Sequence, residues 1–160
     1  MKILIVSDTH GHEENLKKVL KKTGTPDCLI HLGDSECGEA GIRQLSTCPM
    51  HLVAGNCDFF CDLPRTKVVE LEGQRMLLTH GHYYYVNTHM NDLRSAAKAN
   101  GCTIAMYGHT HRPVIDQSEP GLTILNPGSL SFPRQEGKRP SYILMQIENG
   151  SEPTFELCYL

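Results

Sequence analysis

The first third of the chain alternates apolar runs with amphipathic segments. The continuous apolar run KILIVS at 2–7 is typical of a strand buried on both faces. The segment at 12–24, HEENLKKVLKKTG, carries Leu16, Val19 and Leu20 at helical spacing, which predicts a helix. Two further apolar runs and a weaker helical segment predict strands at 27–33 and 50–56 and a helix at 38–45. This strand–helix–strand order predicts a parallel α/β sheet.

After residue 60 the pattern becomes rich in short strands. KVVELEGQRMLLTHG at 67–81 predicts a hairpin that turns at EGQ, and NTHMNDLRSAAKANG at 87–101 predicts a helix that Gly101 ends. Short apolar runs between Pro and Gly turns predict strands at 103–109, 113–117, 122–128, 141–150 and 154–160. Together the two parts predict an α/β fold, a two-sheet β-sandwich flanked by helices. No repeat or linker divides the chain, so we expect one domain over 1–160.

The composition excludes several classes of function. The chain has 160 residues, 39% of them hydrophobic and 21% charged, and a formal net charge of −3. This balance excludes a disordered chain and a broad nucleic-acid surface. No apolar run is long enough for a membrane span, and MKILIVSDTH is too short and too soon charged for a signal peptide. Seven cysteines without CxxC spacing favour a reduced compartment, so we expect a cytoplasmic protein.

Polar residues with metal-binding side chains directly follow five predicted strands. They are Asp8 and His10, Asp34, Asn56, His80, and His109 with His111. Taken singly, an Asp or Asn in such a place is often a helix cap, and a lone His is often packed or solvated. Ligand sites in open α/β sheets lie beyond the carboxyl ends of the strands. Five coincidences of this kind therefore favour one shared site over five separate caps.

The types of these residues indicate what the site binds. Two carboxylates, one carboxamide and up to four imidazoles suit Mn, Fe, Zn or Ni rather than Ca or Cu(I). They are too many for one tetrahedral zinc ion. They suit two ions about 3.5–4 Å apart that share a carboxylate and a water molecule. Such a pair clamps a phosphate group and generates hydroxide near neutral pH.

Five short blocks support this hypothesis as an ordered set. DTHG, GDS, GNCD, THGH and GHTH resemble, in this order, the signature blocks of the calcineurin-like metallophosphoesterases. The short chain, the GNCD block and NPGS at 126–129 are most similar to the small, YfcE-like phosphodiesterase subfamily. The resemblance runs from Asp8 to about Ser131, most of the chain. It implies a dimetal-dependent enzyme that hydrolyses a small phosphodiester with a metal-bridging hydroxide.

The resemblance also implies a role for each site residue. Mn²⁺ is the first choice of metal, with Ni²⁺, Fe²⁺ or Zn²⁺ as alternatives. Asp34 would be the bridging carboxylate, and Asp34, Asn56 and Cys57 would be the catalytic group. The remaining ligands fall into two sets, Asp8, His10 and His111 for one ion, and Asn56, His80 and His109 for the other.

Cys57 departs from the pattern of the family. Many members have a histidine there, which is taken to protonate the leaving group, and Asp58 would orient that histidine. A thiol is a poor match for this task, so we expect a bias towards phosphodiesters with good leaving groups. A phosphomonoesterase remains the alternative. A second alternative is a metal-free scaffold for protein assembly, like a retromer subunit of this fold, but seven competent ligands favour the enzyme.

Three features outside the blocks leave alternatives open. His12 either contacts a substrate phosphate or caps or solvates the helix that follows. The tyrosines at 83–85 either line a pocket for a base or aryl group or simply pack. The composition also does not decide between a monomer and a homo-oligomer.

Overall fold

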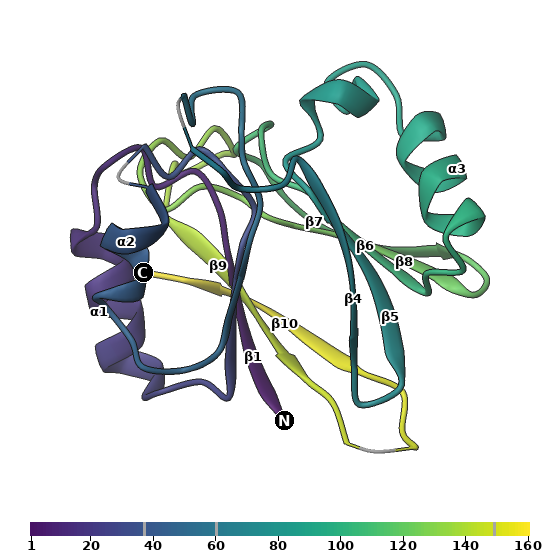
Figure 1. Ribbon diagram of the computed structural model, residues 1–160, viewed down its shortest axis with the longest axis horizontal. Helices are drawn as coiled ribbons and strands as arrows, with labels where there is room; N and C mark the ends of the chain where they lie inside the picture. The colour runs from purple at the N-terminus through teal and green to yellow at the C-terminus, as the bar shows by residue number, and fades with distance from the viewer. Residues whose placement is uncertain (37, 60, 149) are drawn as a thin grey trace.

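Two stacked β-sheets form the centre of the structure. The computed structural model describes residues 1–36, 38–59, 61–148 and 150–160. In these residues, ten strands form two five-stranded sheets that lie face to face (Figure 1). The predicted two-sheet sandwich flanked by helices is therefore confirmed.

The first sheet has the strand order β10-β9-β1-β2-β3. Its strands are β1 (Lys2–Val6), β2 (Cys28–His31), β3 (Met50–Leu52), β9 (Ser141–Gln146) and β10 (Thr154–Tyr159). The predicted parallel arrangement holds for β1, β2 and β3. It is wrong for the whole sheet, because β9 pairs antiparallel with β1 and β10 pairs antiparallel with β9. This edge is built from the C-terminal hairpin β9–β10, and β9 pairs with β1, which lies at the other end of the sequence.

The second sheet has the strand order β4-β5-β6-β8-β7. Its strands are β4 (Thr66–Leu71), β5 (Gln74–Thr79), β6 (Ile104–Met106), β7 (Pro113–Glu119) and β8 (Leu122–Pro127). Strands β5, β6 and β8 run parallel, and the hairpins β4–β5 and β7–β8 add an antiparallel strand at each edge. The hairpin predicted at 67–81 is confirmed, with its turn at Glu72 and Gly73.

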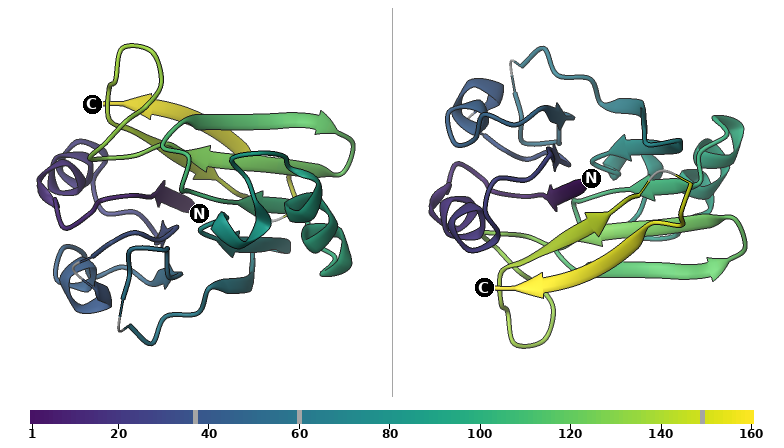
Figure 2. Two further views of the ribbon diagram at one scale, coloured as in Figure 1. Left: turned by 90° about the horizontal axis from the view of Figure 1, so that it is seen from above. Right: turned by 90° about the horizontal axis from the view of Figure 1, so that it is seen from below.

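The helices cover the outer faces of the two sheets. They are α1 (Glu14–Thr23), α2 (Gly38–Arg43) and α3 (Asn91–Ala99), whereas the short 3₁₀ helix η1 (His82–Tyr84) follows the end of β5. Figure 2 shows α1 and α2 on one side of the molecule and α3 on the other. The helix predicted at 87–101 begins later than expected, at Asn91. Residues 85–88 form a turn instead, in which the N–H groups of Thr88 and His89 both donate to the Tyr85 carbonyl.

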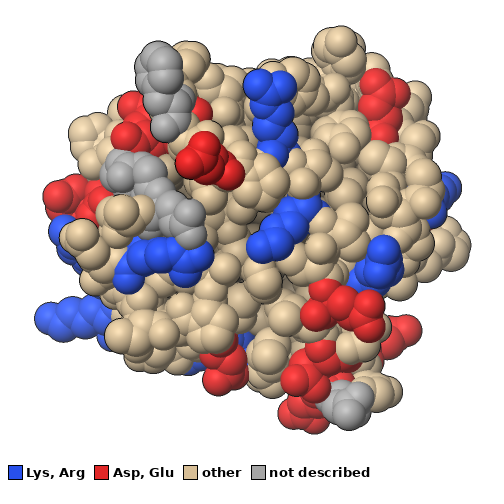
Figure 3. Space-filling model, in the orientation of Figure 1, with Lys and Arg blue, Asp and Glu red and all other residues tan. Residues whose placement is uncertain are grey.

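Alternation along the strands explains where the core lies. Ile3 and Ile5 of β1 face the second sheet and pack in one cluster with Met76 and Leu78 of β5, all at most 1% exposed. The intervening Leu4 faces outward and packs in a second cluster with residues of α1. Each such side chain contributes about 1.5–3 kcal/mol by leaving water. Apart from Asp8 and Asp34, which are buried, the aspartate, glutamate, lysine and arginine side chains of the described residues reach the surface, and both signs are interspersed on the face in Figure 3. No helix among the described residues has the length and apolar character to cross a membrane.

Candidate metal centre

Five loops bring the predicted ligands to one place. The loops follow β1, β2 and β3 in the first sheet and β5 and β6 in the second. The loop after β1 is tied to the loop after β2, since the backbone N–H of Asp8 donates to the Gly33 carbonyl at 3.0 Å. A contact between the sheets joins His80 to the carbonyl of Leu32 at 2.7 Å. The carboxyl ends of strands from both sheets thus meet at one edge, as the sequence predicted.

The backbone is strained where it carries the site. Five predicted ligands have positive φ angles: Asp8 at 55°, His10 at 46°, Asp34 at 53°, His109 at 65° and His111 at 57°. This left-handed region is uncommon for residues other than glycine and costs on the order of 1–3 kcal/mol each. Strain of this kind persists only where the surrounding structure enforces it. The loops therefore hold these side chains in fixed positions, although the strain lowers the stability of the fold.

Close approach of two loops explains the glycines beside Asp34. A Cβ atom at Gly33 would lie 2.7 Å from the backbone nitrogen of Gly55. A Cβ atom at Gly55 would overlap the carboxylate of Asp34. Only glycine permits this packing, which lets Asp34 reach the centre of the site.

The carboxylates of Asp8 and Asp34 are surrounded by imidazole nitrogens. Nε2 of His111 lies 3.0 Å from Oδ1 of Asp8, and Nε2 of His10 lies 3.8 Å from the same oxygen. Oδ2 of Asp34 lies 3.2 Å from Nε2 of His80 and 3.8 Å from Nε2 of His10. One oxygen of Asp34 therefore faces a histidine of each predicted ligand set. The other oxygen, Oδ1, accepts a hydrogen bond of 2.7 Å from the backbone of Cys57.

Hydrogen bonds at Nδ1 determine which nitrogen of each histidine faces the carboxylates. His80 donates from Nδ1 to the Leu32 carbonyl, and His111 donates from Nδ1 to the Phe132 carbonyl, both at 2.7 Å. A carbonyl only accepts, so the proton of the neutral ring lies on Nδ1 and the lone pair lies on Nε2. His10 has Glu36 at 2.6 Å from its Nδ1, with the same consequence. Partners of this kind orient and activate metal-binding histidines.

Several acceptor atoms consequently face one another without a donor between them. Nε2 of His10 lies 3.4 Å from Nε2 of His111. Oδ1 of Asp8 is buried and has no hydrogen-bond partner among the described residues. Leaving such an oxygen unpaired costs about 1–3 kcal/mol or more for a charged group. A cation bound by all three atoms would remove this cost, so the donor set fits a divalent metal ion.

Asn56 and His109 lie at the opposite side of the cluster. Oδ1 of Asn56 lies 3.1 Å from Nε2 of His80, and the rings of His80 and His109 lie 5.1 Å apart. Nε2 of His109 lies 2.7 Å from the side-chain amide of Asn87. The atom of Asn87 at this distance is the amide nitrogen Nδ2, which only donates, so Nε2 of His109 accepts and the proton of the neutral ring lies on Nδ1.

The charges in the site favour cations. Burial opposes ionisation of Asp34, but hydrogen bonds from His80 and Cys57 hold its pKa well below the usual range. Burial likewise opposes protonation of His80, but Asp34 and Asp8 raise its pKa above the ordinary value. In contrast, burial and the neighbouring His80 lower the pKa of His109. The carboxylates that attract a proton to His80 would attract a divalent ion in its place.

Asp58 has a structural role that its sequence position alone did not reveal. Its Oδ1 accepts from the Ser35 hydroxyl at 3.0 Å and from the Glu36 backbone at 2.8 Å, and its Oδ2 accepts from the Gly55 backbone at 2.8 Å. Asp58 thus joins the loops that follow β2 and β3. Beside it, burial and the carboxylate of Asp34 raise the pKa of the Cys57 thiol to about 11.

His12 and two buried or half-buried histidines lie outside the ligand cluster. His12 is exposed, and its ring lies edge-on to Phe132 at 5.7 Å, so its substrate contact stays a prediction. Burial lowers the pKa of His82 to about 4, together with His80 and His109. His31 lies beneath the site, where its Nδ1 accepts from the Gly33 backbone at 3.3 Å and its Nε2 lies 3.0 Å from the Thr9 hydroxyl.

The sequence reasoning did not identify four contacts of the site. They are the Glu36 carboxylate at His10, the Asn87 amide at His109, and the carbonyls of Leu32 and Phe132. Glu36 follows the GDS block directly, which was a usable signal. Backbone carbonyls carry no signal of residue type, and Asn87 lies in a segment that was predicted to be helical.

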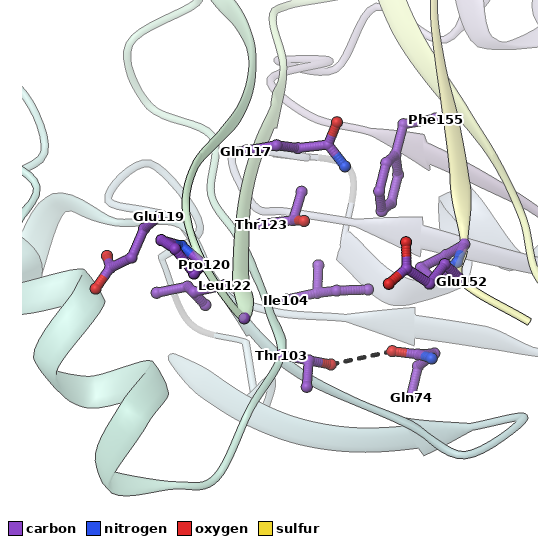
Figure 4. Close-up of a pocket in the computed structure, with 12 residues that line it drawn as sticks. Gln74, Thr103, Ile104, Gln117, Glu119, Pro120, Leu122, Thr123, Glu152 and Phe155 are labelled. Atoms are coloured by element: carbon purple, nitrogen blue, oxygen red, sulfur yellow. Dashed lines mark hydrogen bonds between the residues drawn. The ribbon is translucent and has the colours of Figure 1, made fainter.

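A separate cavity of about 360 Å³ lies at the other end of the second sheet (Figure 4). It is lined near the starts of β5, β6 and β8, where the Thr103 hydroxyl donates to the Gln74 side chain at 3.1 Å. Its ionisable lining residues are Glu119 and Glu152. Among the described residues, neither a histidine nor a cysteine lines it, so its chemistry differs from that of the metal centre.

Comparison with known sequences identifies the family. A profile of the calcineurin-like phosphoesterase superfamily domain matches residues 1–150, so the chain belongs to this superfamily. YsnB, a probable metallophosphoesterase of Bacillus subtilis, is 34% identical over 154 residues, which cover 94% of this chain and 87% of the relative. The phosphodiesterase YfcE of Escherichia coli is 30% identical over 84% of this chain and 82% of its own length.

Solved structures show the same fold. A predicted phosphoesterase of Streptococcus pneumoniae has a TM-score of 0.83 and 30% identity, covering 99% of this chain and 88% of its own. Vps29 of Entamoeba histolytica in complex with zinc has a TM-score of 0.79 and 21% identity, covering 99% of both chains. At this lower identity the likeness concerns the fold alone.

Proposed function

We propose that this metallophosphoesterase is a two-metal phosphodiesterase. One ion would be held by Asp8, His10 and His111, the other by Asn56, His80 and His109, and Asp34 would bridge them. The observation that carries the proposal is the position of Asp34 Oδ2, 3.2 Å from Nε2 of His80 and 3.8 Å from Nε2 of His10. A single oxygen that faces both ligand sets is what two neighbouring cations require.

The chain contributes orientation and charge to this reaction. The two ions would supply Lewis acidity and lower the pKa of a water molecule between them. Asp34 would keep the ions close by reducing their repulsion. Asn56 directs Oδ1 towards His80 and Nδ2 towards the Cys57 side, where its N–H groups would donate to a phosphoryl oxygen. The carbonyls of Leu32 and Phe132 would keep the lone pairs of His80 and His111 in place.

Cys57 supports a diester rather than a monoester as substrate. A group that protonates the leaving oxygen works best with a pKa near the working pH. Without metal ions, burial and Asp34 raise the pKa of the Cys57 thiol to about 11. Cations bound at Asp34 would offset the effect of its charge but not that of burial, so the thiol is a weaker acid than the histidine that many family members carry. Phosphodiesters with acidic leaving groups need little protonation, and the relative YfcE carries the name phosphodiesterase. The substrate would be a small phosphodiester.

The two alternatives have less support. A phosphomonoesterase with poor leaving groups would require an acid that Cys57 does not supply. A metal-free scaffold would be free to lose its ligands, whereas all seven predicted positions carry competent donors here. The likeness to Vps29 concerns the fold and does not favour the scaffold.

The test is hydrolysis of bis(p-nitrophenyl) phosphate by protein stripped with a chelator and reloaded with one metal at a time. We expect no turnover after stripping, and better recovery with Mn²⁺ than with Mg²⁺, because Mg²⁺ prefers oxygen ligands and water. Ni²⁺, Fe²⁺ and Zn²⁺ are the further candidates. Elemental analysis should find two ions per chain in the active sample. Full activity in protein that contains no ion would refute the proposal.

A further inference from the structure

A second feature adjoins the metal centre, a cavity of about 370 Å³ that opens beside Asn56. The loop after β3 and the residues of η1 enclose it. The residues that line it include Phe59, His82, Tyr83 and Arg65. Because Asn56 is a predicted metal ligand and lines the cavity, a phosphate at the metals would place one of its ester groups here.

Tyr83 is exposed, but it lies in a short turn whose neighbouring residues pack against the core. Tyr83 lies in η1. Gly81, which precedes this turn, has a φ of 102°, and the Tyr84 N–H donates to the Gly81 carbonyl at 2.9 Å. The neighbouring Tyr84 and Val86 pack into the core beneath α3. Tyr83 itself remains 54% exposed. The turn therefore presents this ring to the cavity instead of burying it.

Arg65 and His82 contact the ring of Tyr83. The guanidinium carbon of Arg65 lies 4.8 Å from the centre of the ring, and the centre of the His82 ring lies 4.1 Å from it. No carboxylate among the described residues forms an ion pair with Arg65. Stacking on an aromatic ring orients the planar guanidinium, so a cation and a π-surface face the cavity together.

Phe59 is a further exposed aromatic residue of the lining. It is 75% exposed, and its N–H donates to the Cys57 carbonyl at 3.1 Å. Asp58, which precedes it, anchors the same loop to Gly55. Aromatic side chains are a common lining of sites that bind small molecules.

We propose that this cavity binds a planar aromatic group, a nucleobase or an aryl ring, which the phosphodiester retains after hydrolysis. The inference rests on the proposed phosphodiesterase function. Cys57, at the position where the family protonates the leaving group, lines an adjoining cavity with Glu36. The two cavities share Asp58, Phe59 and Cys61, whereas Arg65, His82 and Tyr83 line the first alone among the described residues. The leaving group therefore belongs on the Cys57 side, and the retained ester group belongs on the side of Tyr83 and Arg65.

Three substrates with one leaving group test this assignment. They are thymidine 5′-(p-nitrophenyl) phosphate, phenyl p-nitrophenyl phosphate and methyl p-nitrophenyl phosphate. In Tyr83→Ala, kcat/KM should fall about tenfold for the first two, because a stacking contact is lost, and by less than about twofold for the methyl ester. A loss with thymidine alone would assign the cavity to nucleobases, and a loss with both would assign it to any planar ring.

Two matched variants separate this role from a structural one. Tyr83→Phe keeps the ring and should retain the preference for the aromatic esters. Tyr85→Ala removes another exposed tyrosine, 64% exposed and outside the cavity lining, and should change none of the three values. An equal loss for all three substrates in Tyr83→Ala, or an unchanged preference, would overturn the assignment.

A binding measurement keeps the test independent of turnover. Calorimetry on the Mn²⁺-loaded protein should show phenylphosphonate binding about tenfold more tightly than methylphosphonate, and Tyr83→Ala should remove the difference. If no diester is hydrolysed, the proposed function fails, while the ratio of the two phosphonates still decides the role of the cavity. Equal affinities for both phosphonates in the native protein would refute it.

Discussion

Nε2 of His111 lies 3.0 Å from Oδ1 of Asp8, although the two residues lie in loops that follow strands of different sheets. Nδ1 of His111 donates its proton to the Phe132 carbonyl, so Nε2 carries a lone pair. This lone pair faces Oδ1 of Asp8, which has no hydrogen-bond donor among the described residues. Two acceptors this close repel each other unless a cation lies between them. The pair therefore provides the physical reason to expect metal binding on this side of the site.

The first prediction distinguishes Asp34 from the other ligands. Asp34→Asn should weaken the binding of both ions, because they lose a shared anion, whereas His111→Ala should mainly weaken one. Each loss should exceed the roughly 10–100-fold that partners outside the ligand set contribute. Calorimetric titration of stripped protein with Mn²⁺ measures both binding steps.

Glu36→Gln is the matched control for this comparison. Glu36 contacts Nδ1 of His10, and its side chain is 42% exposed. Loss of this carboxylate should weaken the binding of one ion by no more than about 10–100-fold. Independent and equal losses at both steps in Asp34→Asn and His111→Ala would contradict the bridging role.

The second prediction concerns the leaving group. Cys57→His should raise kcat/KM for alkyl monoesters by up to about 10²–10⁴-fold and leave nitrophenyl diesters nearly unchanged, since only a basic leaving group needs the proton. Cys57→Ser, which adds no acid of suitable pKa, should show no such gain. The measurement is kcat/KM across a series of leaving groups, where the native protein should show the steeper dependence on their pKa. Equal slopes would show that Cys57 does not determine the preference.

The third prediction is a pH dependence of stability that arises from His31. Burial lowers the pKa of His31 from 6.5 to about 4, so the folded chain keeps this ring neutral while the unfolded chain protonates it. The unfolded state then binds more protons between these values, and the free energy of unfolding falls as the pH drops from 6.5 towards 4. The difference amounts to roughly 3 kcal/mol. This contribution is fully present above pH 6.5.

His31→Gln tests this effect. It should lower the free energy of unfolding by about 1–2 kcal/mol at pH 7.5, because a hydrogen bond to Thr9 or Gly33 is lost. The substitution should also reduce the fall in the free energy of unfolding between pH 6.5 and pH 4, because glutamine does not titrate. Urea unfolding in chelator at several pH values measures both effects without a contribution from bound metal. Parallel pH curves for the two proteins would exclude His31 as the cause.

The fourth prediction concerns the loops that Asp58 joins. In Asp58→Asn an amide N–H₂ would replace one acceptor and face either the Gly55 N–H or the donors of Ser35 and Glu36. An unpaired donor should cost about 1–3 kcal/mol in urea unfolding and weaken Mn²⁺ binding, because Asn56 follows Gly55 directly. Asp62→Asn, an exposed substitution in the same connection, should change stability by less than about 0.5 kcal/mol. Equal stabilities for the two variants would contradict this role.

The sequence by itself determined the elements and the chemistry of the site. The apolar run at 2–7 predicts a buried strand because both of its faces must avoid water. Leu16 and Val19 likewise predict which face of α1 is buried in the structure. Polar residues after five strands predict a shared edge because parallel strands end on the same side. Their types limit the ligand, since imidazoles with carboxylates suit borderline divalent metals. The ligand roles themselves remain predictions.

Only the tertiary structure decided how these parts fit together. The antiparallel pairing of β9 with β1 depends on a register, such as Ile5 opposite Ile143, that no local pattern encodes. The tautomers of His80 and His111 depend on backbone carbonyls, which every residue has and which therefore leave no trace in the sequence. The run at 83–85 shows the same limit, because identical side chains pack in the core at Tyr84 and remain exposed at Tyr83. The strand register, the histidine tautomers and the exposure of each tyrosine all depend on how distant segments pack, and the residues that determine this packing are spread over the whole chain.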